Sequence, residues 1–299
     1  MAEVTTARPA LLAGPTPRRS PGLLSWRNLR RHPRVLVSGG VILALVIIAL
    51  LAPVLGRYDP KVSRAIEALQ GPSGRHWLGT DNLGRDVLAR VIWGGRVSLA
   101  VGVISVTIGL SCGVLLGLLA GWRGGVTDLL VMRVIDALLA FPGLLLAISI
   151  TSALGPNLRN AMIAIGIVAI PVYTRLTRGQ VLQLRSREFV EAARALGASD
   201  LRIVSRHLLP NIVSPLIVQA SLSVAFAILA EASLSFLGLG VQPPTPTWGF
   251  DINQARAYLS NGYWWMSLAP GLAILITVLS FNFLGDSVRD MLDPRLRDR

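Results

Sequence analysis

Long apolar runs constrain the fold of this chain more than any other feature of its sequence. The run from Val35 to Leu55 carries no charged residue, and it is long enough for a helix to cross a bilayer, which takes roughly 20 residues. Only 15% of the residues are charged, too few to cover the surface of a soluble domain of this length. We therefore predict an all-α integral membrane protein with six transmembrane helices, at residues 35–55, 97–121, 128–154, 160–174 (continuing toward 178), 211–237 and 265–285.

The distribution of basic residues predicts how these spans are oriented. Six spans place both termini on one side; the segments on that side hold 20 arginines, and the other side holds nine basic residues, seven of them between residues 57 and 96. Loops rich in arginine stay in the cytoplasm. We expect a cytoplasmic basic tail at 1–34 without a removable signal peptide, an extracytoplasmic segment at 56–96, a core at 97–287 and a cytoplasmic tail at 288–299. Arginines beside apolar spans favour this orientation role over nucleic-acid contact.

Glycines and prolines recur inside the predicted spans. Small residues let helices approach closely in lipid, and prolines kink helices. This pattern fits a tightly packed bundle, and it also fits a bundle that bends to open a path. The residues concerned are Gly102, Gly109, Gly113, Gly117, Pro142, Pro171, Pro215 and Pro270.

A polar, arginine-rich insert at 188–211 interrupts the apolar pattern. Its first part has helical spacing, with one apolar face of mostly small residues (Phe189, Ala192, Ala193 and Leu196). Glu188 and Glu191 lie near the start of this short helix, where carboxylates suit the helix dipole, and Gly197 ends it. Ser199 is a suitable cap for a second short helix at 200–208, which Pro210 limits. We predict two short helices joined by a glycine turn at the membrane face.

Two interpretations of this insert differ in what they require. The first is an amphipathic helix that rests on lipid. Against it, the apolar face is rich in alanine and would insert weakly, and a helix resting on lipid has no need of a glycine turn and a terminal proline at fixed spacing. The alternative is a surface that binds another protein, because small residues let the backbone of a partner approach closely and the glutamates can form ion pairs with it. The pattern Glu191-Ala192-Ala193, three residues, Gly197, then Leu209-Pro210 resembles the signature loop of permease subunits of binding-protein-dependent ABC importers.

Other segments resemble the dipeptide, oligopeptide and nickel branch of that family. The segment from Trp77 to Asp86 (WLGTDNLGRD) includes Gly79, Thr80, Asp81, Gly84, Arg85 and Asp86, and Glu231 precedes a matching LSFLGLG run at 234–240. The resemblance to the "C" permease implies the type I importer fold, with residues 185–210 as a cytoplasmic coupling loop in a bacterial inner membrane. It also implies a homologous "B" permease, two ATPase subunits that hold ATP and magnesium, and an extracytoplasmic binding protein. The implied ATPase contacts are Glu188, Glu191, Ala192, Ala193, Gly197, Leu209 and Pro210.

Single polar residues allow both structural and functional interpretations. Glu231, within or at the outer end of the fifth span, is either a pathway residue or a structural hydrogen-bonding group, and we favour the structural role. Asp136 lies three residues after Arg133, so we predict an ion pair between them near the cytoplasmic interface. Asp81, Arg85 and Asp86 either form a charge-paired turn or contact a docking protein.

The sequence offers no catalytic or metal-binding pattern of its own. It has no phosphate-binding glycine loop followed by Lys-Ser/Thr, its three histidines are far apart, and Cys112 is its only cysteine. We therefore expect a transport subunit that is not an enzyme, without a metal or cofactor of its own. Di- or oligopeptides are the favoured cargo, with nickel chelates or glutathione as alternatives. A secondary transporter or channel and a membrane enzyme are other classes, but both leave the polar insert unexplained.

Overall fold

The computed structural model describes residues 33–292. The predictions for the basic tail up to residue 32 and for the part of the C-terminal tail at 293–299 lie outside this range. The described chain consists of helices and connecting loops: α2 (Pro33–Leu50), α3 (Ala52–Leu55), a 3₁₀ turn (Ala65–Glu67), α4 (Val87–Arg123), α5 (Gly125–Leu139), α6 (Gly143–Leu154), α7 (Leu158–Leu184), α8 (Glu188–Ala195), α9 (Asp200–Ile203), a π segment (Val204–Leu208), α10 (Leu209–Phe236), α11 (Trp248–Ala255), a 3₁₀ turn (Arg256–Asn261) and α12 (Trp265–Leu292).

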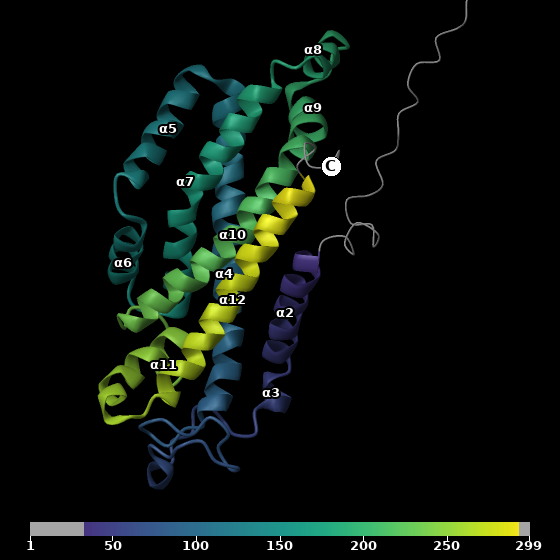
Figure 1. Cartoon of the computed structure of the whole chain (residues 1–299). Helices are drawn as coiled ribbons and strands as arrows, with labels where there is room; N and C mark the ends of the chain where they lie inside the picture. Colours follow the sequence, from purple (N-terminus) through teal and green to yellow (C-terminus); the bar gives the residue numbers. More distant parts are fainter. Residues whose placement is uncertain (1–32, 293–299) are drawn as a thin grey trace, which may run out of the picture.

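The long helices form one elongated bundle (Figure 1). Its apolar core joins α4, α7 and α10 through buried residues such as Val101, Ile165 and Ile228. At one end of the bundle lies α8, and at the opposite end lie α11 and the loop that precedes α4. The start of α2 and the end of α12 both point toward the α8 end, as an even number of membrane crossings requires.

Six membrane crossings account for the apolar helices. Five helices are long and apolar enough to cross a bilayer, and the bent pair α5–α6 supplies a sixth when it is counted as one span. Several bounds differ from the sequence prediction: α2 ends at Leu50 and not at Leu55, and α7 runs to Leu184, beyond the predicted 160–174 core. The second span begins at Val87 and not at Val97, with the Asp86 carboxylate capping α4 by accepting from the Ala89 N–H at 2.8 Å. The last span continues past Gly285 to Leu292.

The predicted third span, 128–154, is not a single helix. It divides into α5 and α6, which meet at an angle of 91°. Pro142 occupies the N-cap of α6 with an extended ψ of 129°. Proline has no N–H for the helical ladder and disfavours helical geometry at the residue before it, which explains the break. By contrast, Pro171, Pro215 and Pro270 lie inside α7, α10 and α12.

Glycines of α4 bring it into direct contact with α7. A Cβ placed on Gly109 would lie 2.6 Å from the Cβ of Ala169, and one on Gly113 would lie 2.5 Å from the Cβ of Tyr173. One turn further along α4, a Cβ on Gly117 would lie 2.6 Å from the Cβ of Thr177. Real Cβ atoms do not approach so closely, so these glycines permit the helix contact. The predicted role of small residues in close helix packing is confirmed here.

Candidate functional site

The polar insert forms a helix and a tight turn at one end of the bundle (Figure 1). Glu188 and Glu191 lie in the first turn of α8, as predicted. Gly197 follows the helix with φ +79°, a conformation that glycine adopts without a steric penalty. The Ala198 N–H donates to the Ala193 carbonyl at 3.0 Å, and the Gly197 N–H donates to the Arg194 carbonyl at 2.9 Å. These two bonds are a Schellman motif, which satisfies the last carbonyls of the helix.

One buried residue, Val190, anchors α8 to the bundle. It is fully buried in a small apolar cluster with Val181 of α7, Ile203 of α9 and Leu208 of the π segment. Around this anchor, the Arg194 guanidinium lies over the ring of Trp122, at the end of α4, at 5.5 Å. Four elements, α4, α7, α9 and the π segment, therefore meet the inner side of α8.

The outer side of α8 is open. Leu196 is 88% exposed and Leu201 is 78% exposed, and a Cβ on Gly197 would meet nothing within 4 Å. The exposed residues also include Glu188, Phe189, Glu191 and Ala192. The prediction of one apolar face with Ala193 on it is wrong in one respect, because Ala193 turns inward and packs against the Val190 cluster.

The second predicted helix of the insert does not end at Pro210. Asp200–Phe236 forms one continuous helical span, in which the π segment precedes Leu209 and Pro210 at the start of α10. A π turn accommodates a residue that cannot continue the α-helical ladder, and such turns are frequent at functional sites. Ser199 does occupy the N-cap position of α9, but its side chain makes no capping hydrogen bond.

At the opposite end of the molecule, the segment 79–86 forms a buried, charge-paired turn. The Arg85 guanidinium donates to the Asp81 carboxylate at 2.5 Å, and both side chains are less than a tenth exposed. The Asp86 carboxylate caps α4 and also contacts Nδ1 of His76 at 2.9 Å. Burial of these three charged groups supports the structural interpretation over contact with a docking protein.

The remaining residues of this turn fit it against its neighbours. Gly79 and Gly84 have φ of +71° and +73°, and a Cβ on Gly84 would lie 1.9 Å from the Arg64 carbonyl oxygen. The Thr80 hydroxyl donates to the Glu67 carbonyl at 2.5 Å, and the Thr80 carbonyl accepts from Nε1 of Trp265, at the start of α12, at 3.1 Å.

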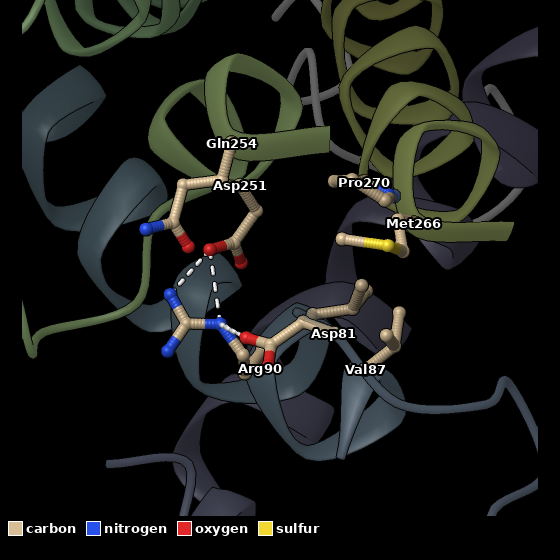
Figure 2. Close-up of a pocket in the computed structure, with 8 residues that line it drawn as sticks. Asp81, Val87, Arg90, Asp251, Gln254, Met266 and Pro270 are labelled. Carbon is tan, nitrogen blue, oxygen red and sulfur yellow. Dashed lines mark hydrogen bonds and ion pairs between the residues drawn. The ribbon is translucent and has the colours of Figure 1, made fainter. Parts of the chain in front are cut away.

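Sequence reasoning missed the ion pair that joins this turn to α11 (Figure 2). The Arg90 guanidinium, in the first turn of α4, donates from Nε to Oδ1 of Asp251 at 3.0 Å and also from a terminal nitrogen. Arg90 lies 3.8 Å from the Asp81 carboxylate as well. The cavity beside the pair, of about 10 Å³, has room for about one water molecule. The one sequence signal for this ion pair was Arg90 itself, a single arginine in an otherwise apolar turn of the helix, which indicates a buried charged partner.

Glu231 is fully buried between α4 and α10. Its two carboxylate oxygens accept hydrogen bonds from two serine hydroxyls, Ser98 of α4 at 3.1 Å and Ser235 of α10 at 2.7 Å. This geometry supports the structural role that the sequence favoured.

The predicted partner of Asp136 is wrong. The Asp136 carboxylate of α5 pairs with the Arg175 guanidinium of α7 at 2.6 Å, and not with Arg133. The broken span leaves α5 leaning on α7, so a partner distant in sequence is nearer than the one three residues earlier. The two side chains are 51% and 53% exposed.

Comparison with known proteins decides the family. Residues 113–298 match the model of the binding-protein-dependent transport system inner membrane component, and residues 20–72 match the N-terminal transmembrane domain of oligopeptide transport permease C. The chain belongs to this permease family. The membership predicted from the 188–210 and 77–86 segments is therefore confirmed.

Relatives of this permease match it over nearly its whole length. It is 44% identical to the dipeptide transport system permease protein DppC of Alkalihalophilus pseudofirmus, over 93% of this chain and 91% of that protein. It is 47% identical to the di/tripeptide transport system permease protein DppC of Pseudomonas aeruginosa, over 91% and 92%. It is 44% identical to the glutathione transport system permease protein GsiD of Pectobacterium atrosepticum, over 93% of each.

A solved structure shares the fold of the permease. An inward-facing conformation of the MetNI methionine ABC transporter aligns with a TM-score of 0.55 and 22% identity, over 69% of this chain and 98% of that chain. The predicted fold class, an all-α membrane permease of the ABC-importer type, is confirmed by this likeness together with the family match.

Proposed function

We propose that this permease forms half of the translocation pathway of an ATP-driven importer and receives the motion of partner ATPases through α8. The observation that carries the proposal is the open surface of α8 and of the start of α9. Leu196, just after α8, is 88% exposed and Leu201 of α9 is 78% exposed. The carboxylates of Glu188 and Glu191 on α8 are exposed as well. Exposed apolar residues rimmed by charges are typical of a protein-binding surface. Two ATPase subunits would hold ATP and magnesium, and a homologous permease would complete the pathway.

Sidedness follows from the same assignment. The α8 end of the bundle faces the cytoplasm, as the arginine distribution also favours. The described start of α2 and end of α12 point to that end (Figure 1). The permease would lie in a bacterial inner membrane. The segment 56–86 and α11 would then face the extracytoplasmic side, where a binding protein delivers the cargo.

Motion of α8 reaches the spans through three contacts. Val190 packs on Val181 of α7 and on Leu208, which continues into α10. Arg194 contacts Trp122 of α4. The Arg185 guanidinium, just before α8, donates to the Gly121 carbonyl of α4 at 3.1 Å. A displacement of α8 therefore pushes on α4, α7 and α10 together, which are the helices that form the core of the bundle.

The proposed cargo is a di- or oligopeptide. The names of the relatives from Alkalihalophilus pseudofirmus and Pseudomonas aeruginosa support peptide transport. Glutathione, itself a peptide, is the second candidate because of the relative from Pectobacterium atrosepticum. Nickel chelates remain the third candidate, from the resemblance to the nickel branch.

Substitution of Gly197 tests the coupling role. Gly197→Asp adds a charged side chain to the outer surface of α8, where we expect it to weaken ATPase binding or uncouple ATP hydrolysis from uptake. A bulky residue at Ala193 should act in the same way by lifting α8 from the bundle.

Gly262→Asp is the matched control, because Gly262 also has positive φ, +88°, and open space around it, but it precedes α12 at the opposite end of the bundle. Co-purification of ATPases and uptake per ATP are measured; normal coupling in Gly197→Asp would refute the proposal.

A further inference from the structure

The ion pair between Asp136 and Arg175 stands out because half of each side chain is exposed. The two groups are 2.6 Å apart, and their exposed fractions are 51% and 53%. Arg133 lies about one turn earlier on α5, is exposed, and makes no ion pair with any residue between 33 and 292. Three charged groups therefore face outward from the same part of α5 and α7.

These charges lie level with the apolar stretch of α4 that leads to the α8 end of the bundle. Gly113 of α4 packs against Tyr173 and Thr174, so Arg175 is level with that part of α4. From there the sequence of α4 stays apolar as far as Trp122, and Leu115 and Leu119 on that stretch are exposed. At 1.5 Å per residue, Arg175 lies roughly 14 Å from the end of α7 at Leu184.

Exposure at this depth needs an explanation. A charged side chain facing hydrocarbon is costly even on the most tolerant scale, and such residues face a water-filled cavity or a partner instead. The neighbouring ion pair, Asp128–Arg178, does not raise the same problem. Its side chains are only 21% and 30% exposed, and Arg178 binds both carboxylate oxygens, at 2.5 and 2.6 Å.

We propose that Asp136, Arg175 and Arg133 line a water-filled pathway and that the two arginines attract a carboxylate of the cargo. This inference rests on the proposed function and deepens it. Two guanidinium groups against one carboxylate leave a net positive charge at the site. Arginine presents a planar fork of N–H donors that matches a carboxylate. A peptide carries a carboxylate at its C-terminus, so the site would meet a group that every free peptide cargo shares.

The first experiment measures contact with water. Cysteine replaces Asp136, Arg133 or Val134, one at a time, after Cys112→Ala has removed the only cysteine. The complete transporter, assembled in membrane vesicles, is treated with a membrane-impermeant maleimide. Val134 is the control, because residues two apart point about 200° apart on a helix, and it is 61% exposed. We expect rapid labelling at positions 136 and 133 and slow labelling at 134.

The outcomes separate this inference from the proposed function. If no ATPase assembles with the permease, the proposed function fails. If the transporter assembles and takes up alanyl-alanine, but positions 136 and 133 react no faster than 134, only the water-filled pathway is refuted.

The second experiment tests the attraction for a carboxylate. Arg133→Gln and Arg175→Gln should each raise the alanyl-alanine concentration at half-maximal uptake about three- to tenfold, the effect of roughly one charge-assisted contact. Arg159→Gln removes the same charge from an exposed position near the start of α7 and should leave that concentration unchanged. Equal effects of all three substitutions, or no effect of the first two, would refute a carboxylate site.

Discussion

The Arg90 guanidinium of α4 and the Asp251 carboxylate of α11 form an ion pair, although 161 residues separate them in the chain. Both lie at the end of the bundle opposite α8, and the Arg90 side chain is only 2% exposed. The same guanidinium donates to the Pro60 carbonyl at 2.9 Å. Arg90 therefore connects the loop before α4, the helix α4 and α11.

Removal of Arg90 should destabilise the permease strongly. Arg90→Ala leaves Asp251 buried without its cation, and breaking a buried pair in this way costs about 3–5 kcal/mol. Replacement of both residues, as in Arg90→Met with Asp251→Leu, should recover much of that loss because no unpaired charge remains. The free energy of unfolding in detergent is the measurement. A double variant no more stable than Arg90→Ala would contradict this account.

The loss in Arg90→Gln should depend on pH. Burial raises the pKa of the Asp251 carboxyl, and the charge of Arg90 opposes that rise. Without Arg90 the pKa rises further, so the folded state binds a proton that the unfolded state releases. The variant is then least stable, relative to the parent, at neutral pH, and its deficit shrinks as the pH falls through the raised pKa. Melting temperatures measured from neutral to acidic pH check this; a deficit independent of pH would count against it.

The contact between α4 and α7 should tolerate no added methyl group at Gly117. A Cβ there would lie 2.6 Å from the Cβ of Thr177 and 2.7 Å from the Thr174 carbonyl oxygen, so Gly117→Ala should cost about 1–3 kcal/mol through overpacking. Gly179→Ala is the control on α7, since nothing lies within 4 Å of its added Cβ. It should be neutral or stabilising, by up to about 1 kcal/mol. Thermal unfolding of both variants is compared, and equal melting temperatures would argue against the close packing.

Local sequence patterns predicted the transmembrane spans and the glycine turn at Gly197, because each of these features depends on residues that are neighbours in the sequence. Apolar runs determine which segments cross the membrane, and a glycine after a short amphipathic helix is enough to end it. The prolines show the limit of such patterns. Pro142 breaks its span, whereas Pro215 lies within one, and Pro210 lies inside the continuous helix Asp200–Phe236, which it was expected to interrupt. Packing by neighbouring helices decides between these outcomes.

Contacts between distant segments could not be predicted. The sequence paired Asp136 with its nearest arginine, but the angle of α5 brings Arg175 closer. Nor does any local pattern connect Arg90 with Asp251, or Ser98 with Glu231. Such pairs depend on how the helices cross, which is a property of the whole bundle.

Replacement of Glu231 by glutamine should destabilise the permease less than replacement by alanine. In Glu231→Gln the side-chain amide can still hydrogen bond to the hydroxyls of Ser98 and Ser235, so stability should fall by less than about 1 kcal/mol. Glu231→Ala leaves both buried hydroxyls without this partner and should cost about 1–3 kcal/mol. Stability and uptake are measured together. If Glu231→Gln abolished uptake with unchanged stability, the carboxylate would act in the pathway and not in the structure.

Val190 and Leu196 should affect different steps of coupling, although both lie at α8. Val190 is fully buried against the bundle and Leu196 is 88% exposed. Val190→Ala leaves the outer surface intact but loosens the anchor, so ATPases should still bind while uptake per ATP falls. Leu196→Ala removes apolar area from the outer surface, so fewer ATPases should co-purify, while uptake per ATP in the assembled fraction stays normal. The ratio of uptake to ATP hydrolysis and the amount of bound ATPase distinguish the two. If both variants changed the same quantity, α8 would not have one side that binds and another that transmits motion.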